Sequence, residues 1–263
     1  MTGTGDPDRP KVPQREITLS VVSHRQNALV NQLLEDVQRV CADRVALVLT
    51  QNVPDPVPFA AGNRTYPAEI IVNRERKGFG VNHNAAFRRC RTPYFCVCNP
   101  DIRLASDVFP PLLQVLTDRR VAVAGPLVRN PAGRIEDSAR RFPTATALLK
   151  KLFVDRREAD YPTDRGPREV DWLAGMFLLF RSDAYRSIGG FDEAYFLYYE
   201  DVDICHRLHS IGMTAILAPR AAVTHDARRA SRRDPRLALQ HLVSILRFLR
   251  RRGLRQDDSA SGV

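Results

Sequence analysis

The sequence predicts an α/β domain with a mainly parallel central sheet and a C-terminal helix. Two observations support this prediction. Short runs of β-branched and aliphatic residues alternate with amphipathic helical patterns over the first hundred residues. The chain has 263 residues, 44% of them hydrophobic, which suits one continuous core better than two average domains. Ligands of parallel α/β sheets bind beyond the carboxyl ends of the strands, so polar residues at those ends are the candidates for function.

The N-terminal half opens with a β-α-β pattern. Residues 17–23 are rich in β-branched side chains, and apolar residues then recur at helical spacing from Leu29 to Val40. The following elements are expected in this order: a strand over 45–49, a strand over 69–72, a helix after the turn at Gly78 to Gly80, and a strand over 94–98. The last of these strands ends at Asn99-Pro100-Asp101.

The C-terminal half is less regular at first. We expect a helix near 105–118 and a short strand over 121–124, followed by a proline- and arginine-rich stretch to about 168 to which we assign no chemistry. Clearer elements follow in this order: an apolar run over 172–180, a turn at 189–190, a helix that begins at Glu200, short strands over 213–217 and 221–223, and a basic amphipathic helix over 236–251.

Composition limits the classes of protein that fit. No run of eighteen apolar residues occurs and the first fourteen residues are polar, so we expect a cytoplasmic protein. The odd number of cysteines favours free thiols: Cys41, Cys90, Cys96, Cys98 and Cys205. The net charge of +10 suits phosphate-rich partners. Because the basic residues concentrate over 228–255, we expect a local basic tail and no nucleic-acid partner.

The end of the strand over 94–98 is a candidate metal site. Asp101 offers a hard oxygen ligand in a turn stiffened by Pro100, which suits a divalent cation that bridges two phosphates. An ordinary Asx turn explains the same residues. His225 follows a predicted strand and could complete an oxygen and imidazole site, although a lone histidine is more often structural.

Five acidic residues lie within twelve positions before and at the start of the helix that begins at Glu200: Asp192, Glu193, Glu200, Asp201 and Asp203. Helix capping explains one or two of them. A carboxylate at a helix start stays ionised near neutral pH and can accept a proton from a sugar hydroxyl. The alternative is a solvated acidic helix start.

At this point the sequence resembles the family 2 glycosyltransferases, in particular the bacterial branch with rhamnosyltransferases of O-antigen and cell-wall glycan assembly. The resemblance covers most of residues 17–247. Its motifs are W-L-A-G-M-F-L-L-F-R (172–181), G-G-F-D-E-x-Y-F-L-Y-Y-E-D-V-D-I-C-H-R-L (189–208) and N-x-x-x-K-G-F-G-V-N-H-N-A-A-F (73–87). It implies a GT-A fold, a single Rossmann-like domain, and an inverting transfer of a sugar from a nucleotide diphosphate to a glycan acceptor.

The resemblance also implies roles for individual residues. Asp201 would be the catalytic base, and Asp101 and His225 would hold Mg2+ or Mn2+. The donor-binding residues would be Ser23, Asn52, Lys77, Gly78, Asn82, Asn84 and Asn99. The acceptor-binding residues would be Trp172, Asp192, Glu193 and Glu200, with a buried core tryptophan as the alternative for Trp172. The lead donor is dTDP-rhamnose, and the resemblance implies a glycan acceptor that is carried on a lipid.

Two positions depart from the family pattern. Asn99 replaces the first acid of the D-x-D metal motif, which leaves a neutral side chain and less charge to hold a cation. The usual V-D-N-x-S-x-D after the second strand reads L-T-Q-N-V-P-D over 49–55, so the usual nucleobase contact is in question.

Other functions remain alternatives. A peripheral membrane or nucleic-acid binding module with a degenerate transferase site would use the basic helix, but it leaves the acid spacing unexplained. A sugar nucleotidyltransferase would need a glycine-rich loop directly after the first strand, where residues 23–26 read S-H-R-Q.

The predicted organisation has four parts: a flexible N-terminus over 1–15, the transferase domain over 16–235, a basic amphipathic helix over 236–253 and a disordered tail over 254–263. The helix has an apolar side composed of Leu237, Leu239, Leu242, Ile245, Leu246 and Leu249. Its flanking cations are Arg236, Arg247, Arg250, Arg251 and Arg252. It could dock on an anionic membrane at the inner face of the cytoplasmic membrane, or pack on its own domain.

Overall fold

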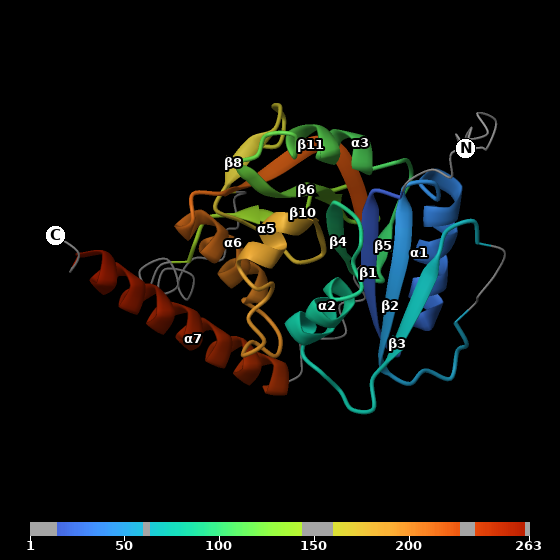
Figure 1. Ribbon diagram of the computed structural model, residues 1–263, viewed down its shortest axis with the longest axis horizontal. Coiled ribbons are helices and arrows are strands. Elements are labelled where there is room, and N and C mark those ends of the chain that lie inside the picture. Colours follow the sequence, from blue (N-terminus) through green and yellow to red (C-terminus); the bar gives the residue numbers. More distant parts are fainter. Residues whose placement is uncertain (1–14, 60–63, 144–159, 227–234, 261–263) are drawn as a thin grey trace, which may run out of the picture.

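The computed structural model describes residues 15–59, 64–143, 160–226 and 235–260, with the backbone alone at 235–236 and from residue 252. Its centre is a nine-stranded sheet (Figure 1). The sheet contains β1 (Ile17–His24), β2 (Val45–Val53), β3 (Ala68–Val72), β4 (Tyr94–Cys98), β5 (Ile102–Arg103), β6 (Val121–Arg129), β8 (Arg168–Val170), β10 (Phe177–Arg181) and β11 (Thr214–His225). The strand order is β3-β2-β1-β4-β10-β6-β11-β5, and β8 also pairs with β11.

Most of the sheet is parallel, as predicted. Strand β1 pairs in parallel with β2 and β4, and β2 with β3. Strand β10 runs antiparallel to both of its neighbours, β4 and β6, and β6 then pairs in parallel with β11. As a result β10 begins at the edge of the sheet where its neighbours end.

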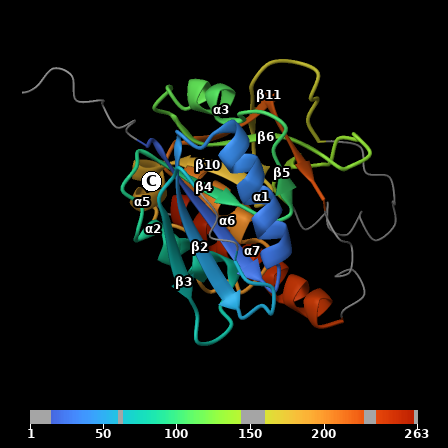
Figure 2. The same cartoon turned by 90° about the vertical axis from the view of Figure 1, so that its right-hand side faces the viewer.

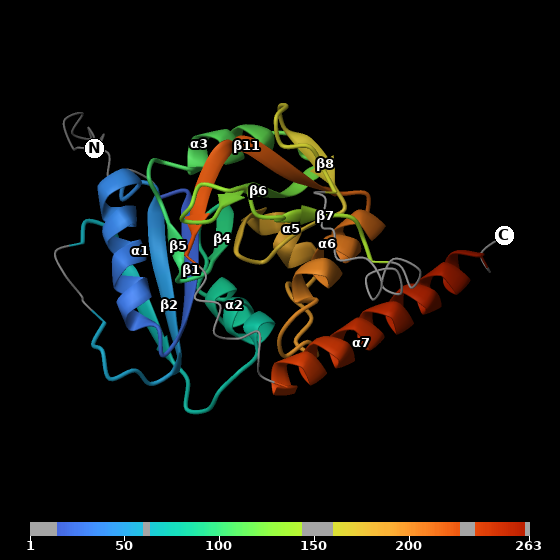
Figure 3. The ribbon, with the colours of Figure 1, turned by 180° about the vertical axis from the view of Figure 1, so that it is seen from behind.

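Helices cover both faces of the sheet. They are α1 (Asn27–Val40), α2 (Phe79–Phe87), α3 (Phe109–Val115), α5 (Ser182–Ser187), α6 (Glu200–Ser210) and α7 (Pro235–Ala260). One core cluster joins α1 and α3 to one face (Figure 3), and a second joins α2, α5, α6 and α7 to the other. The side view shows α1 and α2 on opposite sides of β1 to β3 (Figure 2). All five cysteines are free and buried, as predicted.

Two predicted elements differ from the structure. The apolar run over 172–180 is two strands, because the chain turns at Gly175 between β9 (Trp172–Leu173) and β10. Strand β9 pairs with β7 (Ala139–Arg140) in a separate two-stranded sheet. Conversely, the two short strands expected over 213–223 are one strand, β11, with a register shift between Ala218 and Ala222. Pro219 lies within that shift, where a missing N–H is tolerated.

The C-terminal helix α7 packs on its own domain. Phe248 is buried against Phe142, Tyr199 and His206, and Ser244 donates a hydrogen bond to the carbonyl of Leu197. The helix is longer than the predicted 236–253 and reaches residue 260, into the expected tail, since a single glycine at 253 costs a helix only about 1 kcal/mol. No helix in the described part of the chain is long and apolar enough to cross a membrane.

Candidate active site

The two candidate metal ligands lie side by side. Asp101 follows β4, and His225 ends β11 and pairs with Ile102 of β5. The backbone N–H of Asp226 also donates to the carbonyl of Asp101 (2.9 Å). As a result, Nε2 of His225 lies 3.3 Å from Oδ2 of Asp101. The other carboxylate oxygen of Asp101, Oδ1, is buried without a hydrogen-bond partner among the described residues.

A second carboxylate contacts His225 from its other side. Nδ1 of His225 lies 2.8 Å from Oε2 of Glu136, which follows β6 in the stretch to which the sequence assigned no chemistry. Burial alone would lower the pKa of His225, but hydrogen bonds and charge attraction from Asp101 and Glu136 outweigh it and raise the pKa to about 9. The imidazole is therefore protonated at neutral pH unless a cation replaces the proton.

Asp201 lies in the first turn of α6, and the turn between β9 and β10 holds its carboxylate. The N–H of Gly175 donates to Oδ2 and the N–H of Val202 donates to Oδ1, both at 2.9 Å. Burial raises the pKa of Asp201, while these two N–H groups and the charge of Arg140 oppose the rise. A carboxylate with a raised pKa is a stronger base, which favours proton abstraction.

The chain reaches Asp201 through strained backbone. Tyr198 and Tyr199 both have left-handed conformations, with φ of 70° and 67°. Adjacent residues of this kind cost about 1–3 kcal/mol each and persist where surrounding packing imposes them. Here the rings of both tyrosines pack against His241 of α7. Glu200 follows and is buried, with Oε2 lacking a partner among the described residues, and burial together with the charge of Asp201 raises its pKa.

Asparagine side chains hold the predicted donor loop. The side-chain amide of Asn52, at the end of β2, donates to the carbonyl of Lys77 (2.9 Å) and accepts from its N–H (2.8 Å). Asn73 donates to Oδ1 of Asn52 (2.9 Å) and to Oδ1 of Asn82 (2.7 Å), and Asn82 donates to the carbonyl of Gly78 (2.9 Å). These bonds fix the loop backbone and leave the side chain of Lys77 exposed.

The donor loop lies directly against the acidic segment that precedes α6. A Cβ added to Gly78 would lie 2.8 Å from the carbonyl oxygen of Phe196, so only glycine fits there. The N–H of Phe79 donates to that same carbonyl (2.9 Å). The predicted donor and acceptor segments are therefore in direct backbone contact.

Ser23 and Asn99 lie at neighbouring strand ends. Ser23 is fully buried and donates to Oδ1 of Asn27 (2.6 Å), which closes the turn after β1. The backbone N–H of Asn99 donates to the carbonyl of Met176 (2.9 Å), which ties the Asn99-Pro100-Asp101 turn to the start of β10.

Asn84 anchors the turn at Gly189 and Gly190. Its Oδ1 accepts from Tyr185 (2.7 Å) and from the N–H of Phe191 (3.0 Å), and its Nδ2 donates to the carbonyl of Phe191 (2.9 Å) and to Glu193 (3.0 Å). The protein itself therefore uses the full hydrogen-bonding capacity of this amide. A direct contact between Asn84 and a donor would have to displace one of these bonds.

The remaining predicted acceptor residues have partners from distant segments. Asp192 pairs with Arg251 of α7. Trp172 is 8% exposed and donates from Nε1 to the carbonyl of Arg141 (2.9 Å). The guanidinium of Arg140 lies over its ring, 5.3 Å from the ring centre. One face of Trp172 is thus covered by a cation rather than open to a ligand.

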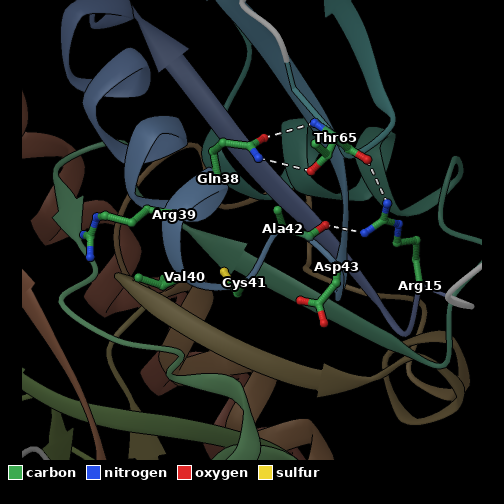
Figure 4. A pocket seen from close by; sticks show the side chains of 8 residues that line it. All are labelled: Arg15, Gln38, Arg39, Val40, Cys41, Ala42, Asp43 and Thr65. Atoms are coloured by element: carbon green, nitrogen blue, oxygen red, sulfur yellow. Dashed lines mark hydrogen bonds between the residues drawn. The ribbon is translucent and has the colours of Figure 1, made fainter.

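A pocket elsewhere contains none of these residues. It lies where α1 ends and where β1, β2 and β3 begin, at the opposite edge of the sheet (Figure 4). Its lining residues are Arg15, Gln38, Arg39, Val40, Cys41, Ala42, Asp43 and Thr65. Arg15 donates to the carbonyls of Ala42 and Thr65, so its guanidinium stabilises the segments that lead into β2 and β3.

Comparison with known families agrees with this geometry. The model of "Glycosyltransferase like family 2" matches residues 13–242, which include β1, the donor loop, Asp101, Asp201 and His225. The chain belongs to this family. As a family 2 member it is a glycosyltransferase, which confirms the resemblance seen in the sequence.

Two curated relatives of this chain are named as rhamnosyltransferases. The chain is 35% identical over 224 residues to the N-acetylglucosaminyl-diphospho-decaprenol L-rhamnosyltransferase of Mycobacterium tuberculosis, with 75% of this chain and 72% of the relative covered. It is 26% identical to the rhamnosyltransferase WbbL of Escherichia coli, with 94% and 98% covered.

Solved glycosyltransferases share the GT-A fold. A mannosyltransferase from Pyrobaculum calidifontis in complex with GDP-Man and Mn2+ superposes with a TM-score of 0.62 at 16% identity, over 91% of this chain and 67% of that one. GalNAc-T7 with UDP, GalNAc and Mn2+ also gives 0.62 at 12% identity, and this chain spans 45% of its length. The predicted fold class is therefore confirmed.

Sequence reasoning missed two residues of this candidate site. Glu136 contacts His225, and Arg140 lies within electrostatic reach of Asp201. Both occur in the irregular stretch after β6, which shows neither helical nor alternating periodicity. Their contacts depend on the folded structure, in which Arg140 pairs with Trp172 of β9 and Glu136 meets His225 at the end of β11.

Proposed function

We propose that the protein transfers a sugar from a nucleotide diphosphate with inversion, using Asp201 as general base. One observation carries this proposal. The N–H of Gly175 binds the Asp201 carboxylate, and the carbonyl of the next residue, Met176, accepts a hydrogen bond from the N–H of Asn99. The base and the candidate metal turn are thereby attached to the same short segment. In the proposed step Asp201 takes the proton of an acceptor hydroxyl, the oxygen attacks the anomeric carbon, and the nucleotide diphosphate leaves with the electron pair of the broken bond.

Asp101 and His225 fit a divalent cation, Mg2+ or Mn2+. The buried, unpartnered Oδ1 of Asp101 and the Nε2 of His225 beside its Oδ2 are oxygen and imidazole ligands of the kind that Mn2+ accepts. No group of three or more His, Cys, Asp or Glu side chains among the described residues could hold a metal. Phosphate oxygens and water would therefore complete the coordination. When bound, the cation neutralises charge that develops on the leaving diphosphate.

The proposed donor is dTDP-rhamnose and the proposed acceptor is a lipid-linked glycan. Support comes from the names of two relatives that are rhamnosyltransferases, one of which has N-acetylglucosaminyl-diphospho-decaprenol in its name. The donor would bind along the loop that Asn52 and Asn82 fix, within reach of the exposed Lys77 side chain. An ammonium in that place would attract the diphosphate.

We also propose that α7 places the enzyme on an anionic membrane surface. Opposite the face that packs on the domain, Leu239, Leu242, Val243 and Leu246 are 51–62% exposed at the spacing of one helical stripe. Arg247 and Arg250 flank this stripe and are exposed, whereas the side chains of Arg236 and Arg252 lie outside the described residues. Ile245, expected on the apolar side, packs against the domain core instead. Basic residues near an anionic leaflet contribute about 1 kcal/mol each.

The test of the transferase proposal is a screen of purified protein against a panel of nucleotide sugars, with and without Mn2+, read by release of the nucleotide diphosphate. Asp201→Asn should lower transfer by roughly a hundredfold or more while leaving donor binding unchanged, because only the base is removed. Asp118→Asn is the matched control, since Asp118 precedes β6 at the opposite edge of the sheet. Transfer by Asp201→Asn at the wild-type rate would exclude this residue as the base.

The membrane proposal has a separate test. Leu242→Ser combined with Leu246→Ser should reduce co-sedimentation with liposomes that contain anionic lipid, and salt should reduce co-sedimentation of the wild type. Ile211→Ser is the control, because Ile211 is as exposed as Leu242 but follows α6. Point substitutions are preferable to removal of α7, which would uncover the core around Phe248. Equal sedimentation of the double variant and the control would rule out this helix face.

A further inference from the structure

Glu136 is the one carboxylate among the described residues that contacts His225 on the side away from Asp101. We propose that Glu136 is a positioning residue: it fixes the ring orientation and the tautomer of His225, so that Nε2 is directed to the cation beside Asp101. This inference rests on the metal site of the proposed function and adds to it a residue outside the coordination sphere.

Backbone pairing places Glu136 precisely enough for this role. After β6 the chain reverses, with Gly133 in a left-handed conformation (φ 77°) and a bridge between Arg129 and Ile135. The N–H of Glu136 then donates to the carbonyl of Val128 on β6 (2.8 Å). On the other side of β6, Thr224 of β11 pairs with Arg129, and His225 is the next residue. The end of β6 therefore positions both Glu136 and His225.

The chemistry of the contact selects one tautomer. An ionised carboxylate can only accept a hydrogen bond, so the 2.8 Å contact requires a proton on Nδ1 of His225. In the neutral imidazole the lone pair is then on Nε2, which lies 3.3 Å from Oδ2 of Asp101. A carboxylate that accepts from the second nitrogen of a metal-binding histidine orients the ring and strengthens the ligand.

Because the site is largely buried, water cannot easily take the place of Glu136 as the hydrogen-bond partner of His225. The side chains of His225, Asp101 and Glu136 are 13%, 16% and 25% exposed. Without Glu136, the Nδ1–H of His225 would lose its partner in a largely enclosed position, and the ring could turn to exchange its two nitrogens. The predicted result is a weaker cation site rather than an unfolded domain.

The experiment compares two opposite substitutions at this position. Glu136→Gln keeps an oxygen at the same reach but removes the charge, whereas Glu136→Asp keeps the charge but is one methylene shorter. Mn2+ affinity is measured at pH 8.5, where competition from the proton on His225 is smaller than at neutral pH, by calorimetry and by the electron paramagnetic resonance signal of free Mn2+, without donor or acceptor. Positioning predicts that Glu136→Gln stays within roughly tenfold of wild type, while Glu136→Asp and Glu136→Leu weaken binding by about 10–100-fold.

Controls separate this inference from the proposed metal site itself. Glu69→Leu makes the same chemical change on exposed β3 and should leave Mn2+ affinity unchanged. Asp101→Ala must weaken Mn2+ binding for the site to exist; unchanged binding there would overturn the metal site and the inference with it. If Asp101→Ala weakens binding but Glu136→Leu does not, only the inference fails. A larger loss for Glu136→Gln than for Glu136→Asp would mean that charge matters rather than position, which also overturns it.

Discussion

The affinity of the protein for a divalent cation should rise steeply with pH, because His225 must lose a proton before Nε2 can bind the cation. In the metal-free protein the carboxylates of Asp101 and Glu136 outweigh the effect of burial and raise the pKa of His225 to about 9. A histidine without these neighbours would already be mostly neutral at pH 7. The perturbation is therefore pH alone, applied to the unmodified chain.

The expected magnitude follows from the pKa. With a pKa of about 9, roughly 0.3% of His225 is neutral at pH 6.5 and about 24% at pH 8.5, so the apparent cation affinity should rise about 75-fold over this range. The stability of the metal-free protein should change in the opposite direction. A raised folded-state pKa stabilises the fold fully below the unfolded value of about 6.5, and this contribution, at most about 3 kcal/mol, is lost as the pH rises through 9.

Both effects can be measured with the same samples. Calorimetric titration with Mn2+ at half-unit steps from pH 6.5 to 8.5 gives the affinity, and urea unfolding in EDTA gives the free energy of unfolding. His225→Ala is the reference: it should bind more weakly, without the 75-fold dependence on pH, and its unfolding should lack the wild-type loss of stability. A wild-type affinity that stays constant over this range would refute the assignment of His225 as a ligand that exchanges a proton for the cation.

Two further predictions concern the candidate metal ligands and the turn at Gly189 and Gly190. Asp101→Ala and His225→Ala should each weaken metal-dependent donor binding, and the double variant should lose less than the sum, because both side chains act on one cation; a fully additive loss in calorimetry would place them in separate sites. Gly190→Ala should lower the free energy of unfolding by more than about 2 kcal/mol, because the new Cβ would lie 2.4 Å from Oδ1 of Asn84. Gly189→Ala, with a similar φ but open space around the new Cβ, should cost only about 1 kcal/mol in chemical denaturation, and equal losses would contradict the steric argument.

Local sequence patterns predicted much of the fold. The β-branched run of β1 and the helical spacing of α1 identify a β-α-β opening. The parallel direction of β1, β2 and β4 follows from that alternation. The direction of β10 could not be predicted, because an apolar run reads the same for a parallel and an antiparallel buried strand. Its separation from β9 depends on a turn at Gly175 that tertiary contacts stabilise.

Residues of the candidate site were predictable from the sequence where an acidic residue follows a recognisable strand or begins a recognisable helix. Asp101 after a strand and Asp201 at a helix start carry such a context, and the structure shows the contacts of each. Glu136 has no such context, since its partner lies 89 residues away and only the pairing of β6 with β11 brings them together. The family resemblance pointed to Asn82 as a donor-site residue but could not reveal that its amide binds the loop backbone.

The reversed strand β10 has a consequence for how the enzyme works through a catalytic cycle. Because β10 begins where β4 ends, the two residues just before β10 contact both candidate groups: Met176 accepts a hydrogen bond from the N–H of Asn99, and Gly175 donates one to the Asp201 carboxylate. In the proposed mechanism, the spacing between the candidate metal turn and the proposed base is therefore set by the hydrogen bonds of this short segment. We therefore expect the distance between these two groups to change little from one turnover to the next.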